Sequence, residues 1–281
     1  MKVTKTPKCF VGGAFTRSES GRVVAIKDRS GAFFANIPLC SKKDLRGAVE
    51  AAAKGSAAWA KRSPYNRAQI LYRLAEMLEA RSAEMTEALT LTNAKSAARE
   101  VRATIDRIVH FAGWADKYEQ VLGTVNPVAS SHFNFTITEP VGIVGIIAPP
   151  KNPLLVLVTL ILHSITAGNS VVALAPSSHA YPAILLGEML ATSDLPVGVV
   201  NLLSGDVTEL APSFATHEHI RAIAAVVDPH TAKTIEQGAA ASVKRVRITA
   251  PNADWFDATF DSAWQLRDFT EAKTVWHPIS N

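Results

Sequence analysis

The residues that could do chemistry in this chain are few and far apart. Its two cysteines, Cys9 and Cys40, have a spacing that matches no metal motif and do not make a disulfide framework. The histidines that could activate a nucleophile pair with neither cysteine nor serine at a recognisable spacing: His163, His179, His217, His219 and His230. Residues two apart do not share a helix face, so we expect His217 and His219 to lie in a solvated turn. Covalent catalysis needs a nucleophile and its activating group within hydrogen-bond reach, and the sequence predicts neither that pairing nor a metal site.

One stretch, residues 139–154, has the pattern of a ligand-binding element. Residues 141–148 are almost all apolar, which is typical of a strand buried on both faces of a parallel sheet. Pro149 and Pro150 end that strand, and Pro153 suits the first turn of a following helix. Open α/β sheets bind ligands beyond the carboxyl end of such a strand, where this chain has Lys151.

Composition excludes several classes of function. The 281 residues carry a net charge of +4, and their Lys and Arg residues are scattered without aromatic interleaving, so no nucleic-acid partner is expected. The apolar run 154–162 is too short to span a bilayer, and we interpret it as a buried helix with no membrane partner. The N-terminus lacks the apolar core of a signal peptide, so we expect a cytoplasmic protein.

The second half of the chain alternates strands and helices. Strands are predicted at 141–148, 169–175, 198–203, 222–227 and 244–249, and helices at 153–167, 181–193, 207–216 and 230–241. This pattern predicts an α/β fold with a doubly wound parallel sheet of Rossmann-like, dinucleotide-binding type. No G-x-G-x-x-G follows any of these strands, so the ordinary nucleotide fingerprint is absent.

The first half is predicted to be mainly helical after short strands at 23–26 and 33–37. Ser41 and Asp44 resemble a capping box before a helix at 42–60, a second helix opens at Pro64, and helical pattern continues over 82–121. Residues 132–138 then alternate with a period of two, which places Phe133, Phe135 and Ile137 on one face of a strand. A terminal strand over 269–278 includes Val275 and Trp276, and we expect it to pair beside 132–138 in a two-stranded ribbon.

Several motifs, in order and at matching spacing, are similar to the aldehyde dehydrogenase superfamily. They are EPVGIVGII at 139–147, AGNSVV at 167–172, LPVGVVN at 195–201 with Gly205, and VKRV at 243–246, with FVGG at 10–13 and DLRGAVEAA at 44–52. The resemblance covers about residues 1 to 250 and resumes at FTEAKTV, 269–275, which looks like the family's C-terminal oligomerisation strand. Between these points the family has its catalytic domain, and here a short stretch replaces it.

The resemblance also implies which catalytic groups are lost. The family's nucleophilic cysteine belongs to the missing piece, and we interpret Cys9 and Cys40 as small apolar core residues. Lys151 stands where the family has the asparagine that stabilises the oxyanion; Asn152, one residue later, does not take over that role. The family's general-base glutamate falls on Thr249.

The cofactor motifs of the family have changed as well. Its ribose-binding lysine and glutamate fall on LAPSS, 174–178, where neither is present. Its phosphate-binding turn falls on VDPHTA, 227–232: Val227 replaces a glycine, Pro229 removes an N–H donor and Asp228 would repel a phosphate. We therefore assign no catalytic, cofactor-binding or metal residue, and we expect no cofactor.

The resemblance implies a division of the chain. Residues 1–128 and 141–256 are predicted to form a degenerate NAD-binding-type domain, and 129–140 with 265–281 an oligomerisation arm, without a catalytic domain. The chain resembles the cysteine-less C-terminal half of double-length aldehyde dehydrogenases, in which that half packs on a normal unit.

We therefore expect an inactive accessory subunit that pairs through its arm with a full-length aldehyde dehydrogenase, or with itself as a homodimer. Unpaired strand edges and exposed aromatic side chains on the arm would be covered by the partner. The predicted interface residues are Phe133, Phe135, Ile137, Val275 and Trp276.

Three other interpretations stay open. The altered crevice could hold a nucleotide or another small ligand, with Lys151 as a phosphate contact. The chain could be an enzyme of different chemistry that uses Lys151 or His230, although neither has a visible activating partner. It could also be a fragment of an active enzyme; Met1 and the family-like terminal strand favour a complete, internally shortened product.

Overall fold

A seven-stranded sheet lies at the centre of the computed structural model, which describes residues 6–28, 30–91 and 96–279. The strand order is β11-β10-β7-β8-β9-β1-β2. The strands are β1 (Cys9–Val11), β2 (Ala14–Thr16), β7 (Ile143–Ile147), β8 (Ser170–Pro176), β9 (Val200–Gly205), β10 (Ile220–Val226) and β11 (Arg245–Thr249). Strands β7 to β11 pair in parallel, whereas β1 pairs antiparallel with β9 and β2. The predicted doubly wound α/β fold is confirmed.

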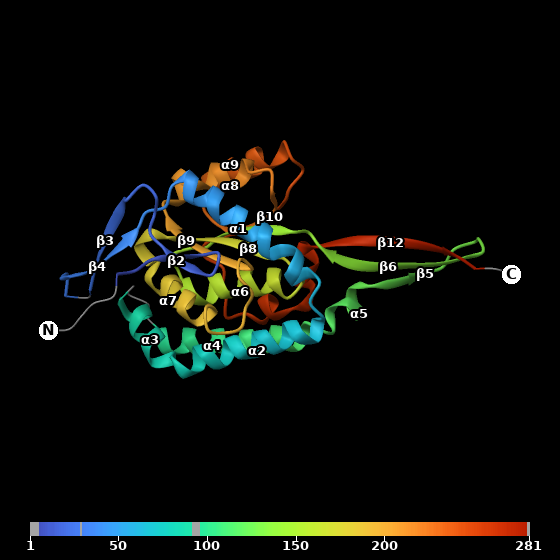
Figure 1. The fold of residues 1–281 in the computed structure, drawn as a ribbon, viewed down its shortest axis with the longest axis horizontal. Coiled ribbons are helices and arrows are strands. Elements are labelled where there is room, and N and C mark those ends of the chain that lie inside the picture. Colours follow the sequence, from blue (N-terminus) through green and yellow to red (C-terminus); the bar gives the residue numbers. More distant parts are fainter. Residues whose placement is uncertain (1–5, 29, 92–95, 280–281) are drawn as a thin grey trace.

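Helices cover both faces of this sheet (Figure 1). On one face lie α1 (Lys42–Ala60), α8 (Val207–Thr216) and α9 (Pro229–Ala240). On the other lie α6 (Pro153–Ile165) and α7 (Tyr181–Leu190), and beyond them α2 (Pro64–Ala80), α3 (Ser82–Leu91) and α4 (Ala97–Trp114). A short helix, α5 (Tyr118–Leu122), leads from α4 toward the end of the molecule from which a β arm projects.

The period of two along the buried strands divides the core between the two faces. Val144 and Ile146 of β7 pack in the cluster with α2, α4, α6 and α7, whereas Ile143 and Ile147 pack in the cluster with α1, α8 and α9. Every residue of α6 is buried, which explains its uninterrupted apolar run as a core helix. Among the described residues, no helix has the length and apolarity needed to cross a membrane.

Local signals in the first half predicted most of its elements. Ser41 and Asp44 make the expected capping box at the start of α1, and Pro64 opens α2. A separate hairpin consists of β3 (Val23–Lys27) and β4 (Phe33–Pro38). The helical pattern predicted over 82–121 is divided into α3, α4 and α5, and residues 92–95 within it lie outside the described residues.

The arm is a second sheet with three strands, β12-β6-β5, which projects from the body (Figure 1). These are β5 (Thr124–Asn126), β6 (His132–Pro140) and β12 (Thr270–Pro278). The tail pairs beside β6 as expected, from Thr270 opposite Pro140 to Pro278 opposite His132. A two-stranded ribbon was the wrong expectation, because the short strand β5 also pairs with β6. A third strand matters because an isolated two-stranded ribbon is marginal in water.

The body and the arm are joined through the buried side chain of Asn169, in the AGNSVV motif. Its amide nitrogen donates to the carbonyl oxygens of Ser164 and Phe269, both at 2.9 Å, and its amide oxygen accepts from Gly142 N at 2.9 Å. One side chain therefore ties the end of α6, the start of β7 and the residue before β12 together.

We expect Asn169→Ala to lower the free energy of unfolding by about 2–4 kcal/mol, because buried carbonyl and N–H groups lose their partners. Urea denaturation measures this difference, and Asn252→Ala, at an exposed turn position, is the matched control. An Asn169→Ala protein as stable as that control would show that the three contacts do not hold the junction.

Candidate functional site

The crevice where ligands bind in this type of sheet lies between β7 and β10. Strands β8 and β9 extend the sheet on one side of β7, and β10 and β11 extend it on the other, so the strand order reverses between these two neighbours. Helix α6 follows β7 and α9 follows β10. The N-terminal turns of two helices, with their unpaired N–H groups, therefore lie at one crevice.

The turn after β7 leads into α6, whose first N–H groups are bonded by a side chain of another helix. Asn152, the residue before α6, has left-handed backbone angles and makes no side-chain cap. Glu100 of α4 supplies the acceptor instead: its Oε1 accepts from Leu154 N at 2.9 Å and from Leu155 N at 3.1 Å. Burial raises the pKa of Glu100, and the two N–H donors oppose that rise. The N-terminus of α6 is thus closed by a carboxyl group of the chain itself.

The turn after β10 is closed in the same way by Asp228. Its Oδ1 accepts from the backbone N of His230 at 2.9 Å and of Thr231 at 3.1 Å, and its Oδ2 accepts from the Thr231 hydroxyl at 2.7 Å. These hydrogen bonds, the Thr231 hydroxyl first, hold the pKa of Asp228 below its usual range. The N–H groups on which the family turn would bind a phosphate therefore already have an anionic partner.

Lys151 lies in the same crevice but points to main-chain oxygens. Its Nζ is 3.4 Å from the carbonyl oxygen of Asn252 and 3.5 Å from that of Ala253. Carbonyl groups do not activate an amine as a nucleophile, so this contact supports no catalytic role. It ties the residues after β11 to the turn after β7.

His230 lies in the first turn of α9, at the crevice, whereas the two cysteines, His217 and His219 lie away from it. Cys9 and Cys40 contact each other beside Ser204 of β9. Strand β8 lies between β9 and β7, so this contact is away from the crevice between β7 and β10. Both are buried, as the sequence predicted. His217 and His219 lie in the turn before β10, at the opposite end of that strand from the crevice, with ring centroids 5.9 Å apart. Across the ranges that the structure describes, no three His, Cys, Asp or Glu side chains are grouped to hold a metal ion.

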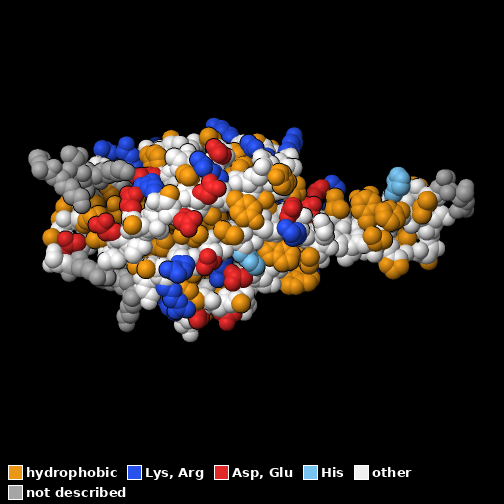
Figure 2. Space-filling view, turned by 90° about the horizontal axis from the view of Figure 1, so that it is seen from below, with side chains coloured by type: hydrophobic (Ala, Val, Ile, Leu, Met, Phe, Trp, Pro, Cys, Tyr) orange, Lys and Arg blue, Asp and Glu red, His pale blue; other side chains and the backbone are white. Residues whose placement is uncertain are grey.

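The arm has two faces of different character. In the antiparallel register Phe135 lies opposite Val275, and Phe133 and Ile137 share their face, with the Phe133 and Phe135 rings 5.5 Å apart. Phe133 is 46% and Ile137 44% exposed, whereas Phe135 and Val275 are half-buried, so the exposed aromatic side chains expected on the arm include Phe133 but not Phe135. Apolar side chains gather along the projecting arm in Figure 2.

Trp276 is on the other face of the arm, because it pairs with Asn134 and not with Phe135. It is 57% exposed and lies edge-on to the ring of His132, 5.8 Å away between centroids. The five predicted interface residues are therefore divided between two faces, with Trp276 alone on the more polar one. Their role in binding stays a prediction.

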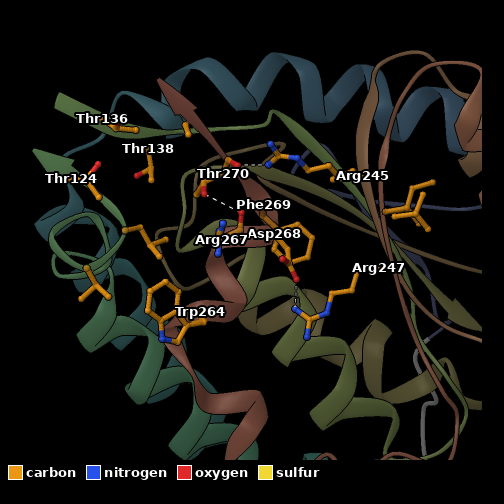
Figure 3. Close-up of a pocket in the computed structure, with 16 residues that line it drawn as sticks. Thr124, Thr136, Thr138, Arg245, Arg247, Trp264, Arg267, Asp268, Phe269 and Thr270 are labelled. Carbon is orange, nitrogen blue, oxygen red and sulfur yellow. Dashed lines mark hydrogen bonds and ion pairs between the residues drawn. The ribbon is translucent and has the colours of Figure 1, made fainter. Parts of the chain in front are cut away.

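A cavity of about 920 Å³ lies at the base of the arm, between β11 and the segment that leads into β12 (Figure 3). Arg247 pairs with Asp268 at 2.8 Å, and Arg245 pairs with Glu271 at 2.6 Å while donating to the carbonyl oxygen of Thr270. These ion pairs connect the arm and the segment before it to β11, the edge strand of the main sheet. We therefore interpret the cavity as space left where the arm meets the body.

The comparisons with known proteins agree with this architecture. A family model described as the aldehyde dehydrogenase family matches residues 15–251. The chain is 30% identical to retinal dehydrogenase 2 of Gallus gallus, over 92% of this chain and 52% of that protein. It is also 30% identical to 2-hydroxymuconic semialdehyde dehydrogenase of Pseudomonas sp. (strain CF600), over 86% of this chain and 51% of that protein.

The solved structures that resemble this fold are also about twice as long as the matched part. The NAD+ complex of an aldehyde dehydrogenase from Bacillus cereus superposes with a TM-score of 0.83 at 24% identity, over 88% of this chain and 51% of that one. The chain thus spans about half the length of the relatives it matches.

Two features of the site were not found from the sequence. The cap by Asp228 has a local signal that was available, an aspartate followed by proline at the first helical position and threonine at the third. The cap by Glu100 has no such signal, because 54 residues separate that carboxyl group from Leu154.

We expect the isolated chain to bind NAD weakly or not at all, since Asp228 occupies the phosphate turn and adds like-charge repulsion. Calorimetry with NAD measures this, with an active full-length aldehyde dehydrogenase as the positive control. Micromolar affinity, about −8 kcal/mol, would contradict the prediction.

Proposed function

Because this chain belongs to the aldehyde dehydrogenase family and spans about half the length of its relatives, we propose that it acts without catalysis, as an accessory subunit. In this proposal it pairs through its arm with a full-length aldehyde dehydrogenase. The single observation that carries the proposal is the arm, which keeps an exposed apolar face while the ligand crevice of the body is closed. In this proposal residues 1–128 and 141–256 act as the scaffold and 129–140 with 265–281 as the arm, to which the pairing of β5 with β6 adds Thr124–Asn126.

The closed crevice supports the absence of catalysis. Both helix N-termini at the strand-order reversal donate hydrogen bonds to carboxyl groups of the chain itself, those of Glu100 and Asp228. The two cysteines of the sequence lie beside β9, away from that crevice. Among the described residues at this reversal neither cysteine is present, and the N–H groups of His230 and Thr231 are already bonded to Asp228.

The exposed edge of the arm supports pairing with a partner. Within the described residues β12 pairs on one side only, with β6, so its other edge leaves N–H and C=O groups available. Such an edge is a template for strand addition, in which main-chain hydrogen bonds supply affinity and side chains fix the register. The apolar face beside it, with Phe133, Ile137 and Val275, then gains a cover.

Two copies of this chain could in principle cover each other's arms, and the homodimer is the competing assembly. A full-length subunit is favoured because the resemblance to the family implies an arm that adds a strand to the catalytic-domain sheet of a neighbouring subunit, and this chain spans only about half the length of its relatives. The mass of the isolated chain in solution separates the two assemblies. The cytoplasmic location remains part of the same proposal.

We expect the pure chain to reduce neither NAD nor NADP in the presence of aldehydes. Spectrophotometric detection of reduced cofactor measures this, again against an active full-length enzyme. If the wild-type chain reduces the cofactor and Cys9→Ser or Cys40→Ser abolishes that activity, the proposal of an inactive subunit is wrong.

We expect Ile137→Asp to weaken association with a co-expressed full-length aldehyde dehydrogenase about 30-fold, since a buried apolar contact of a hot spot is worth roughly 2 kcal/mol. Trp276→Asp tests the other face and is expected to change affinity in the same direction. Light scattering of the purified mixtures measures both effects. Substitutions are preferable to deletion of the tail, which would also remove β12 from its pairing with β6.

The matched control is Val243→Asp, which places the same charge at a 91% exposed valine in the turn between α9 and β11. If Ile137→Asp and Trp276→Asp both bind the partner as tightly as this control, the arm is not the interface. A wild-type chain that is a stable dimer alone and ignores the partner would favour the homodimer.

A further inference from the structure

The two cysteines, 31 positions apart in sequence, contact each other in the fold. Cys9 Sγ lies 3.3 Å from Cys40 Sγ and 3.5 Å from the hydroxyl oxygen of Ser204. Both thiols are free and their side chains are 2% and 1% exposed. A disulfide requires about 2.0 Å between sulfur atoms, so small side-chain rotations are enough to bring them into bonding distance.

The backbone holds both residues against the same strand, β9. Cys9 belongs to β1, whose Phe10 pairs with Leu202, and the backbone N of Cys40 donates to the carbonyl oxygen of Ser204 at 2.9 Å. The Ser204 hydroxyl donates in turn to the carbonyl oxygen of Pro38 at 2.6 Å, next to the cysteine-bearing turn. Because both main chains are fixed to one strand, the sulfur atoms stay close to each other.

A cavity of about 510 Å³ is lined by both cysteines and by charged side chains of both signs: Arg17, Lys43 and Arg46 with Glu19, Asp44 and Glu50. A small neutral oxidant such as hydrogen peroxide can enter a space of this size. The hydrogen bond from the Cys40 thiol lowers the pKa of Cys9 against the opposing effect of burial, and the same contact together with burial raises the pKa of Cys40. The 3.3 Å contact lets one thiol stabilise a thiolate on the other, and we assign the thiolate to Cys9.

We propose that Cys9 and Cys40 are a redox modification site, at which hydrogen peroxide forms a reversible disulfide that fastens β1 to the start of α1. The Cys9 thiolate attacks one peroxide oxygen, the O–O bond breaks, and Cys9 sulfenic acid and hydroxide form. The Cys40 sulfur then attacks Cys9 Sγ, the S–O bond breaks, and hydroxide leaves to take up the thiol proton. In sum, two thiols lose two electrons and two protons, and one peroxide becomes two waters. A dithiol reductant reverses the reaction by thiol–disulfide exchange.

The disulfide would join Cys9 to the residue directly before Ser41, the N-cap of α1. It would close a loop that contains β2, β3 and β4, and so restrict the unfolded chain. The expected rise in Tm is on the order of 5–10 °C for a chain of this size.

Intact-mass analysis of the wild-type chain tests the proposal directly. The protein is treated with a small excess of hydrogen peroxide, then labelled with N-ethylmaleimide under denaturing conditions. We expect loss of two hydrogens and no label, and two labels after dithiothreitol; peptide mapping is expected to find Cys9 linked to Cys40. Two labels after peroxide, cysteine sulfinic acids, or bonds only between separate chains would overturn it.

Thermal unfolding with and without peroxide is the second measurement, and Cys40→Ser is the matched control because serine keeps a small hydrogen-bonding side chain. The wild-type Tm is expected to rise with peroxide and to return with dithiothreitol, while Cys40→Ser shows no rise. An equal rise in Cys40→Ser would show that oxidation elsewhere in the chain causes the effect, and would contradict the role of the pair.

Discussion

The first N–H groups of α6 and α9, which have no acceptor within their own helices, are the constraint on which the candidate site depends. The strand order places both helix N-termini at one crevice, and buried or partly buried N–H groups must find acceptors. In a nucleotide-binding protein a ligand phosphate can supply them. Here Glu100 and Asp228 accept these hydrogen bonds, so carboxyl groups of the chain itself satisfy N–H groups at both helix starts.

The apolar core does not depend on whether a ligand or the chain itself accepts hydrogen bonds from these N–H groups. Its stability comes from apolar strands that feed two separate clusters, one on each face of the sheet, and from the fully buried helix α6. None of these contacts requires a nucleophile, a base or a phosphate turn. The architecture and the chemistry of such a fold are therefore separable, because function resides in sites placed on folds.

The arm depends on the body through a small number of polar contacts. Asn169 binds the carbonyl oxygen of Phe269 from inside the body, and Arg245 and Arg247 bind the segment around it from the edge strand β11. These contacts fix where the three-stranded sheet leaves the body. Beyond them the sheet stands free in Figure 1, and among the described residues its apolar face and the outer edge of β12 stay uncovered.

Local patterns in the sequence determined the elements and much of what the site lacks. The alternation of strand and helix after residue 141, the Ser41 capping box and the period of two in β6 depend on neighbours within a few positions, so they can be read without a structure. The loss of a cysteine and a glutamate from the family's positions is equally a matter of residue identity. The Asp228 cap could have been found by the same reasoning.

Contacts between distant segments were decided by the tertiary structure alone. Glu100 reaches the start of α6 across 54 residues, Cys9 meets Cys40 because both are fixed to β9, and the three-residue strand β5 forms because β6 offers it an edge. No local pattern encodes these meetings, because each depends on how packed elements place side chains that the chain order keeps apart. The division of Phe135 and Trp276 between two faces has the same origin: the register of β12 against β6 decides it.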